Sequence, residues 1–330
     1  MASDDEQAPS ALAQLRRLLD EDRIYDLEHI ADGAELPLET VARLFRAASR
    51  HRDDGRYGAS DIAYAKDLAR VVRRMPVDAI ERSLRARVRN VTQIVVGELS
   101  IARLDHAVVA ALESGADAEE IGRTLAEVGR EIIPAMGRLL AADHEYVLRA
   151  LLDSQVVEQA SQDFERELDM AVAFVDLVGF TRLSAATDPA GVGSVLNAFE
   201  DRVTAVVRDV GDVMVAKTIG DAVMLISGSP DLLVEALLRI VSEPDEELGD
   251  VGRRAGMAFG EVLVRDGDYI GSTVNLAARL TDLGRPASLV VDDEVVEHLT
   301  REWEYSKLPP TRLKGIGTRR PIRVRAPRED

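Results

Sequence analysis

An aspartate, Asp176, stands inside an otherwise apolar run of the sequence. The run AVAFVDLVGF over residues 171–180 has the composition of a buried strand. A second carboxylate, Asp221, follows 45 residues later, between the strand-like runs 213–217 and 222–226. Because a buried carboxylate without a partner is unfavourable, we expect both to be paired or metal-bound. Two aspartates at the edges of neighbouring strands could hold a pair of divalent cations for in-line displacement at phosphorus, although either one alone is more typical of a turn at a strand end.

Two further features could contact a nucleotide. Gly179 lets the backbone approach a ligand closely, and a helix that begins after it would direct free N–H groups at a phosphate. The segment GDYIGSTVNLAAR over residues 267–279 places Asn275 and Arg279 four positions apart, and therefore on one face of a predicted helix. An arginine beside an asparagine suits a phosphate with developing charge and a sugar oxygen. Taken alone, the segment also fits a solvated helix face that follows an ordinary turn.

The elements that must position these residues fall into two halves. Over residues 1–165 apolar side chains recur at helical spacing almost throughout, as at Val41, Leu44 and Phe45. The period changes at Met170, and strand-like and helix-like runs then alternate over about 160 residues, as in a mixed α/β domain. Because no glycine-rich linker separates the halves, we expect a rigid helix to join them.

Composition excludes several classes of protein. A chain of 330 residues predicts two domains. The 41 lysines and arginines against 59 acidic residues give a formal charge of −18, which argues against nucleic-acid binding and against an anionic membrane surface. The absence of cysteine excludes thiol catalysis, disulfides and thiolate zinc sites. No apolar run approaches the roughly 18 residues of a transmembrane segment, and the acidic start lacks a signal-peptide core, so we predict a cytoplasmic protein.

Four segments together resemble one known family. In order along the chain they are FVDLVGFTRLS, KTIGDAVM, GDYIGSTVNLAARL and LKGIGTRRPIRV. They resemble the catalytic domain of class III nucleotidyl cyclases. The resemblance implies an α+β protein, in which an N-terminal all-helical domain precedes a ferredoxin-like α/β catalytic domain. We therefore predict a helical regulatory domain over residues 1–143, a linker helix over 144–167 and a cyclase catalytic domain over 168–330.

The resemblance implies how metal ions and phosphates would be bound. Asp176 and Asp221 match the two aspartates that hold two Mg²⁺ or Mn²⁺ ions, and the backbone carbonyl of Leu177 should join one of these ions. The backbone N–H groups of Gly179, Phe180 and Thr181 match the family's phosphate loop.

The resemblance also implies roles for five side chains. Lys217 and Asp268 match the pair that contacts the adenine edge, where guanylate cyclases typically carry a glutamate and a small residue or cysteine. Asn275 and Arg279 match the pair that acts on the transition state: the asparagine positions the ribose and the arginine neutralises charge at the reacting phosphorus. Lys314 matches a basic residue that contacts the triphosphate tail.

The implied activity is that of an adenylate cyclase, which converts ATP to 3′,5′-cyclic AMP and pyrophosphate. In this family one protomer supplies the metal-binding aspartates and its partner supplies the other four residues, so a chain that carries all six implies a homodimer with two composite sites. The alternative is a catalytically silent receptor that uses the cyclase fold to bind a nucleotide. We favour the enzyme, because such a receptor would be expected to have lost part of this set.

The first half resembles, more loosely, the helical regulatory domain of some actinobacterial cyclases. The matching segments are LPLETVARLFRAASR and YGASDIAYAKDLARVV. They also resemble a helix-turn-helix unit, but the many acidic residues of this half argue against DNA binding. The resemblance suggests regulation by acidity or by a small lipid ligand. His144 stands at the head of the predicted linker helix and is our candidate for a pH-sensing residue, the alternative being an ordinary surface histidine.

Overall fold

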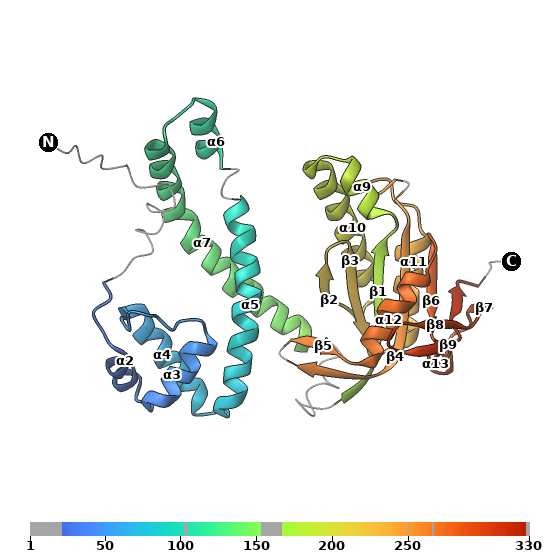
Figure 1. Ribbon diagram of the computed structural model, residues 1–330, viewed down its shortest axis with the longest axis horizontal. Helices are drawn as coiled ribbons and strands as arrows, with labels where there is room; N and C mark the ends of the chain where they lie inside the picture. Colours follow the sequence, from blue (N-terminus) through green and yellow to red (C-terminus); the bar gives the residue numbers. More distant parts are fainter. Residues whose placement is uncertain (1–21, 102–104, 153–166, 250, 266, 328–330) are drawn as a thin grey trace. The chain divides into compact units, whose positions relative to one another are not determined.

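The computed structural model describes residues 22–101, 105–152, 167–249, 251–265 and 267–327. The chain divides into two compact units, Met1–Tyr146 and Val147–Asp330 (Figure 1). Of the predicted linker helix, residues 144–152 belong to a long helix, and residues 153–166 lie outside the described residues.

The first unit is helical over its described residues. Val41, Leu44 and Phe45 recur at helical spacing and are buried, which agrees with the pattern in the sequence. They pack in one core with Ile30 and Tyr57. The helices are α2 (Leu27–Ala34), α3 (Leu38–Ala47), α4 (Ala59–Val72), α5 (Val77–Ile101), α6 (His106–Glu113) and α7 (Ala118–Leu152).

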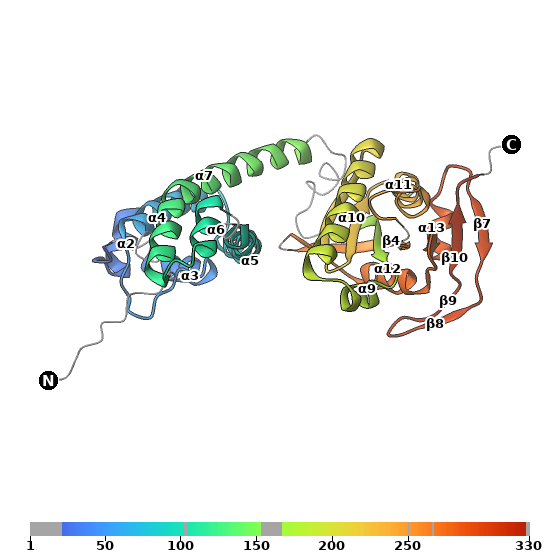
Figure 2. The ribbon, with the colours of Figure 1, turned by 90° about the horizontal axis from the view of Figure 1, so that it is seen from above.

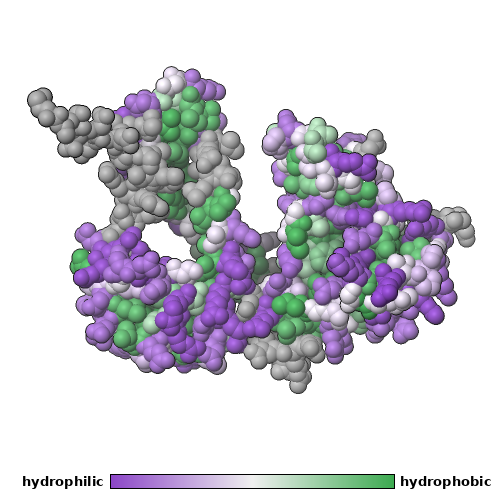
Figure 3. Space-filling view, viewed as in Figure 1, coloured by the Kyte–Doolittle hydropathy of each residue, from purple (hydrophilic) through white to green (hydrophobic). Residues whose placement is uncertain are grey.

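Several large apolar side chains of this unit are exposed on its long helices. Figure 3 shows hydrophobic patches on the viewed face of the unit, between hydrophilic ones. Exposed residues on α5, α6 and α7 include Ile94, Val95, Val96, Leu112, Ile133 and Leu139. No helix in the described part of the chain is both long enough and apolar enough to cross a bilayer.

The second unit is built on one mixed sheet with helices on both faces. The strand order is β2-β3-β1-β4-β6-β10-β7, with β5 paired to β4, and all pairs are antiparallel except β4 with β6. The strands are β1 (Glu167–Leu177), β2 (Val213–Ile219), β3 (Ala222–Ser227), β4 (Arg253–Arg265), β5 (Asp268–Ile270), β6 (Ser288–Val291), β7 (Glu304–Lys307) and β10 (Ile322–Arg325). A separate hairpin pairs β8 (Thr311–Leu313) with β9 (Gly317–Arg319).

The two faces of the sheet carry different helices. One core joins the sheet to α10 (Pro189–Val210) and α11 (Pro230–Ser242), and a second core joins it to α12 (Ser272–Leu283) and the β8–β9 hairpin. In Figure 2, α11 and α12 lie on opposite sides of the central strands. Two short helices, α9 (Phe180–Ala186) and α13 (Asp293–Glu297), complete the unit. The predicted α+β organisation, helices first and a mixed sheet second, is confirmed.

The alternation of side chains between the two faces of β1 determines on which face Asp176 lies. Ala173 and Val175 belong to the core under α10 and α11, whereas Val172 and Phe174 belong to the core under α12. Because neighbouring side chains of a strand point to opposite faces, Asp176 lies on the α12 face of the sheet.

Candidate active site

Strand pairing brings the two predicted metal-binding aspartates together. Asp176 on β1 lies opposite Ala222, the first residue of β3. Asp221 precedes Ala222 in the two-residue turn between β2 and β3, and its neighbour Gly220 has a φ of 63°, which suits glycine in so tight a turn.

The environment of these carboxylates suits a divalent cation. Burial raises the pKa of Asp221 most, and the nearby charge and hydrogen bonding of Asp176 raise this pKa further, while Arg254 lowers it. The two carboxylates offer hard oxygen ligands of the kind that Mg²⁺ and Mn²⁺ prefer. Among the described residues no cluster of three or more histidines, aspartates or glutamates suits a metal ion, so further ligands would have to be backbone oxygens, water or substrate.

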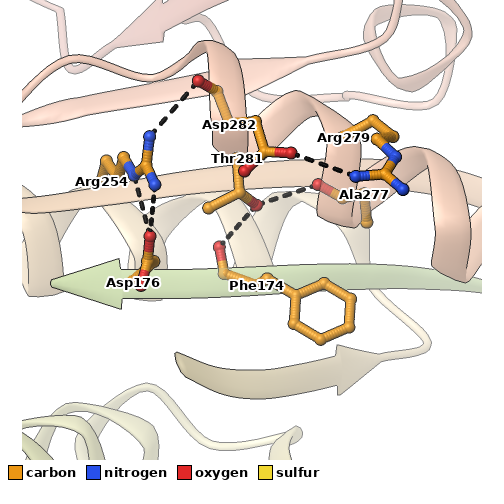
Figure 4. Close-up of polar contacts among 7 residues, drawn as sticks. All are labelled: Phe174, Asp176, Arg254, Ala277, Arg279, Thr281 and Asp282. Carbon is orange, nitrogen blue, oxygen red and sulfur yellow. Dashed lines mark hydrogen bonds and ion pairs between the residues drawn. The ribbon is translucent and has the colours of Figure 1, made fainter. Parts of the chain in front are cut away.

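Arg254 is a site residue that the sequence analysis missed. It lies opposite Asp176 on β4, and its Nε and Nη2 donate to Asp176 Oδ2 at 2.9 and 2.6 Å (Figure 4). Both nitrogens use the same oxygen, which leaves Oδ1 outside this interaction. Its Nη1 also donates to the backbone oxygen of Asp282 at the end of α12, at 3.3 Å. The available signal was a pair of arginines, Arg253 and Arg254, at the start of a largely apolar strand.

The structure brings Lys217 and Asp268 into direct contact. Lys217 Nζ donates to Asp268 Oδ1 at 2.5 Å, although 51 residues separate them in the chain. Lys217 follows an irregularity in the pairing of β2 with β3, and Asp268 begins β5. The side chains retain 36% and 47% of their exposure, so both remain accessible to a ligand.

The predicted phosphate loop follows β1 directly. Gly179 has a φ of 80° and precedes α9, whose first residues are Phe180 and Thr181. The N–H groups of a first helical turn have no partner within the helix, so they can donate to a ligand. Gly179 also lines a cleft together with Val178, Arg182, Leu183 and Val251. The side chain of Leu177 is buried in the core, which fixes the backbone next to Asp176.

Asn275 and Arg279 lie on the exposed side of α12. Leu276 and Leu280, each one position further on, are buried against the sheet. Arg279 Nη1 contacts Asp282 Oδ2 at 3.4 Å, and Figure 4 shows its side chain directed toward that residue. Within the described residues, no hydrogen bond or ion pair joins Asn275 or Arg279 to Asp176, Asp221, Lys217 or Asp268. Within one chain, therefore, Asp176 lies near Asp221 and Lys217 contacts Asp268, while Asn275 and Arg279 lie apart from both pairs on the exposed face of α12.

The last two predicted residues lie elsewhere. Lys314 is exposed in the turn between β8 and β9, beside Gly315 with its φ of 82°. His144 is exposed on α7 in the first unit.

Comparison with known proteins identifies the second unit. Residues 163–324 match the model of the family described as adenylate and guanylate cyclase catalytic domain. An uncharacterised protein of Mycobacterium tuberculosis is 35% identical over 186 residues, which are 56% of this chain and 48% of that protein. The chain thus spans about half the length of this relative.

Two further relatives match across both halves of the chain. A protein of Mycobacterium tuberculosis named pH-sensitive adenylate cyclase is 30% identical over 339 residues, covering 96% of this chain and 82% of that protein. A protein of Streptomyces coelicolor named adenylate cyclase is 30% identical over 305 residues, covering 91% and 78%. The similarity therefore includes the helical half.

Proposed function

Because the chain belongs to the family of adenylate and guanylate cyclase catalytic domains, we propose that it is an adenylate cyclase, which converts ATP to 3′,5′-cyclic AMP and pyrophosphate. The observation that carries the choice of substrate is the contact between Lys217 and Asp268. Relatives named adenylate cyclase that match both halves of the chain support it.

The Lys217–Asp268 pair has the polarity that the adenine edge requires. The ammonium group of Lys217 can donate to a ring nitrogen, and the carboxylate of Asp268 can accept from the exocyclic amine. Guanine presents an oxygen where adenine has its amine, so Asp268 would face an acceptor. Once a bound base covers this pair, a ligand that leaves either group unpaired is disfavoured.

Asp176 and Asp221, with the carbonyl of Leu177, would hold two Mg²⁺ or Mn²⁺ ions. Such ions supply activation of the ribose 3′-hydroxyl and neutralisation of the triphosphate charge. The backbone N–H groups of Gly179, Phe180 and Thr181 would bind phosphate oxygens. Before substrate binds, Arg254 compensates the charge of Asp176 and fixes its orientation.

Asn275 and Arg279 would act on the transition state. In the reaction the 3′-oxygen attacks the α-phosphorus and pyrophosphate leaves. Asn275 would orient the ribose, Arg279 would neutralise the charge that develops at phosphorus, and Lys314 would bind the triphosphate tail.

We propose that the working form is a homodimer with two composite sites. Asn275 and Arg279 have exposed side chains. Within the described residues they form no polar contact with Asp176 or Asp221. Exposed apolar residues flank the Lys217–Asp268 pair: Val215 and Ile219 on β2 and Ile270 on β5. A second copy could cover these side chains while it completes each site.

We also propose that the helical half regulates the catalytic half. One supporting observation is that the relative named for its pH sensitivity matches the helical half as well. His144 is exposed on α7 and remains our candidate for a pH-sensing residue. For the proposed small lipid ligand, the first unit offers a cleft in which apolar residues of α5 lie beside Arg50, Arg87 and Tyr64.

The deciding experiment is an assay of the purified full chain with ATP and either Mg²⁺ or Mn²⁺. We expect cyclic AMP and pyrophosphate in equal amounts. Tight nucleotide binding without product from either metal, in a folded dimer, would instead support the silent-receptor alternative.

The assignment of the adenine-binding pair is tested by Lys217→Glu combined with Asp268→Cys. Because both polar partners of adenine are lost, we expect kcat/KM for ATP to fall by about 100-fold or more. The control is Lys307→Glu, which repeats the charge change of Lys217→Glu at an exposed position of β7. Unchanged kcat/KM for ATP in the double variant would show that another pair contacts the base.

A further inference from the structure

A buried carboxylate lies outside the site described above. Asp292 follows β6 and stands at the N-cap position of α13, where its side chain makes no capping hydrogen bond, and it is 1% exposed. Its backbone N–H donates to the carbonyl of Met257 at 3.4 Å, which joins it to β4. Its Oδ1 is buried and has no hydrogen-bond partner among the described residues. Such an oxygen is unfavourable in a folded protein and calls for a physical explanation.

The cation that faces Asp292 comes from the β8–β9 hairpin. Arg319, the last residue of β9, places its Nε 3.6 Å from Asp292 Oδ2. This Nε is also buried and has no hydrogen-bond partner among the described residues. The carboxylate of Asp292 and the guanidinium of Arg319 therefore attract each other by charge, without a hydrogen bond from Nε. This attraction is lost when Asp292 is protonated.

Burial and the carboxylate of Asp293 favour the neutral form of Asp292, whereas the nearby arginines favour its ionised form. Burial raises the pKa of Asp292 most, and the adjacent carboxyl group of Asp293 on α13 raises it further, to about 6, although the backbone N–H of Asp293 and the charge of Arg319 lower it. From β10, Arg323 pairs with Val290, two residues before Asp292, and within the described residues its buried Nε has no hydrogen-bond partner. A protonated Asp292 can donate to the carboxylate of Asp293, whereas an ionised Asp292 must rely on Arg319.

The hairpin held by Arg319 also carries Lys314. Leu313 and Ile316, which stand on either side of Lys314 in the chain, pack into the core under α12. Thr311, at the start of β8, pairs with Arg319 at the end of β9, so Arg319 stands at the base of the hairpin. A contact at this base limits how far the turn can move, and hence where the ammonium group of Lys314 can lie.

We propose that Asp292 and Arg319 are positioning residues that hold the β8–β9 hairpin, and with it Lys314, against the triphosphate of the substrate, and that proton uptake by Asp292 releases this hold. The inference rests on the proposed function for the role of Lys314. The only chemical change is the uptake of one proton from solvent by Asp292. The protonated carboxyl group then donates a hydrogen bond to the carboxylate of Asp293, and Arg319 loses its ionic partner.

The test compares the full-length wild type with Asp292→Asn and Arg319→Gln between pH 5 and 8. In the wild type we expect KM for ATP to rise about two- to fivefold as the pH falls through about 6, as the loss of one ion pair would give. Both variants should show the raised KM at all pH values with little change in kcat. The double variant should be no worse than either single variant. The control, Arg320→Gln, removes the same charge from an exposed neighbour and should behave as the wild type does.

A second measurement does not depend on activity. Hydrogen exchange of residues 311–319, corrected for the intrinsic pH dependence, should accelerate in the wild type between pH 7 and 5. Asp292→Asn should exchange at one fast rate throughout. If cyclic AMP is formed but KM and hairpin exchange follow pH identically in the wild type and Asp292→Asn, the inference is wrong and the proposed function stands. If no cyclic AMP is formed, the proposed function fails, and hairpin exchange still decides whether Asp292 controls the hairpin.

Discussion

The Asp176→Asn variant is expected to lose two to four orders of magnitude in cyclase rate. The substitution keeps the shape of the side chain but removes a negative ligand for the divalent cations. Metal ions supply several kcal/mol of transition-state stabilisation, and about 1.4 kcal/mol corresponds to a tenfold change in rate. The carboxamide oxygen can still accept from Arg254, so we expect the fold to survive. Steady-state assays over a range of Mn²⁺ concentrations measure the loss.

The matched control is Asp169→Asn, which removes an exposed carboxylate from the same strand. It should retain at least half of the wild-type rate. A rate for Asp176→Asn within tenfold of the wild type at saturating Mn²⁺ would contradict a role for Asp176 in metal binding.

Mixing two inactive variants tests whether the sites are shared between protomers. Asp176→Asn and Asn275→Ala should each be inactive alone. In a random mixture half of the dimers are heterodimers, and each contains one site without either substitution, so about a quarter of the wild-type activity should return. Confirmed heterodimers without recovery would indicate that each site is built from a single chain.

The aspartate pair could be predicted from the sequence because the signal is local. A single carboxylate in the apolar strand that contains Asp176, and a second one in a short turn at Asp221, are both visible in the residue pattern. Their proximity follows from the antiparallel pairing of β1 with β3, of which the sequence analysis expected only that the two strands are neighbours. The roles of Lys217 and Asp268 came from family resemblance alone, since the residues are 51 positions apart in the chain.

Contacts set by strand register across the sheet could not be predicted. Asp176 meets Arg254 because β1 and β4 pair at these residues, which are 78 positions apart. Asp292, which follows β6, meets Arg319 at the end of β9, although 27 positions separate them in the chain. A shift of the register by one residue would turn each side chain to the other face of its strand, and no local pattern fixes that register.

The helical half was predicted by its apolar spacing, which places Val41, Leu44 and Phe45 in the core as expected. The same pattern does not specify polar contacts between helices. Asp61 is fully buried on α4 and accepts from Arg50, whose guanidinium also lies over the ring of Tyr64. In the sequence, the position of Asp61 indicates only that a helix begins there.

Replacing Gly256 with alanine is expected to destabilise the catalytic unit by about 3 kcal/mol or more. Gly256 lies on β4 beneath α12, which carries Asn275 and Arg279. A Cβ atom at Gly256 would lie 2.1 Å from the backbone nitrogen of Thr281 and 2.6 Å from the carbonyl oxygen of Ala277. Backbone atoms of a helix cannot turn aside as a flexible side chain can, so α12 would have to move away from the sheet.

Gly193→Ala is a control in the same unit for which the expected change in stability has the opposite sign. Gly193 lies inside α10, and a Cβ atom there would meet nothing within 4 Å. Alanine is favoured over glycine in a helix by about 0.5–1 kcal/mol, so this variant should be slightly more stable than the wild type.

Trp303, the only tryptophan of the chain, donates from its Nε1 to Asp231 at 2.9 Å within the catalytic unit, so urea unfolding followed by its fluorescence reports on that unit. A midpoint for Gly256→Ala equal to that of the wild type would mean that α12 does not pack directly on β4, and the positions given for Asn275 and Arg279 would then be wrong as well.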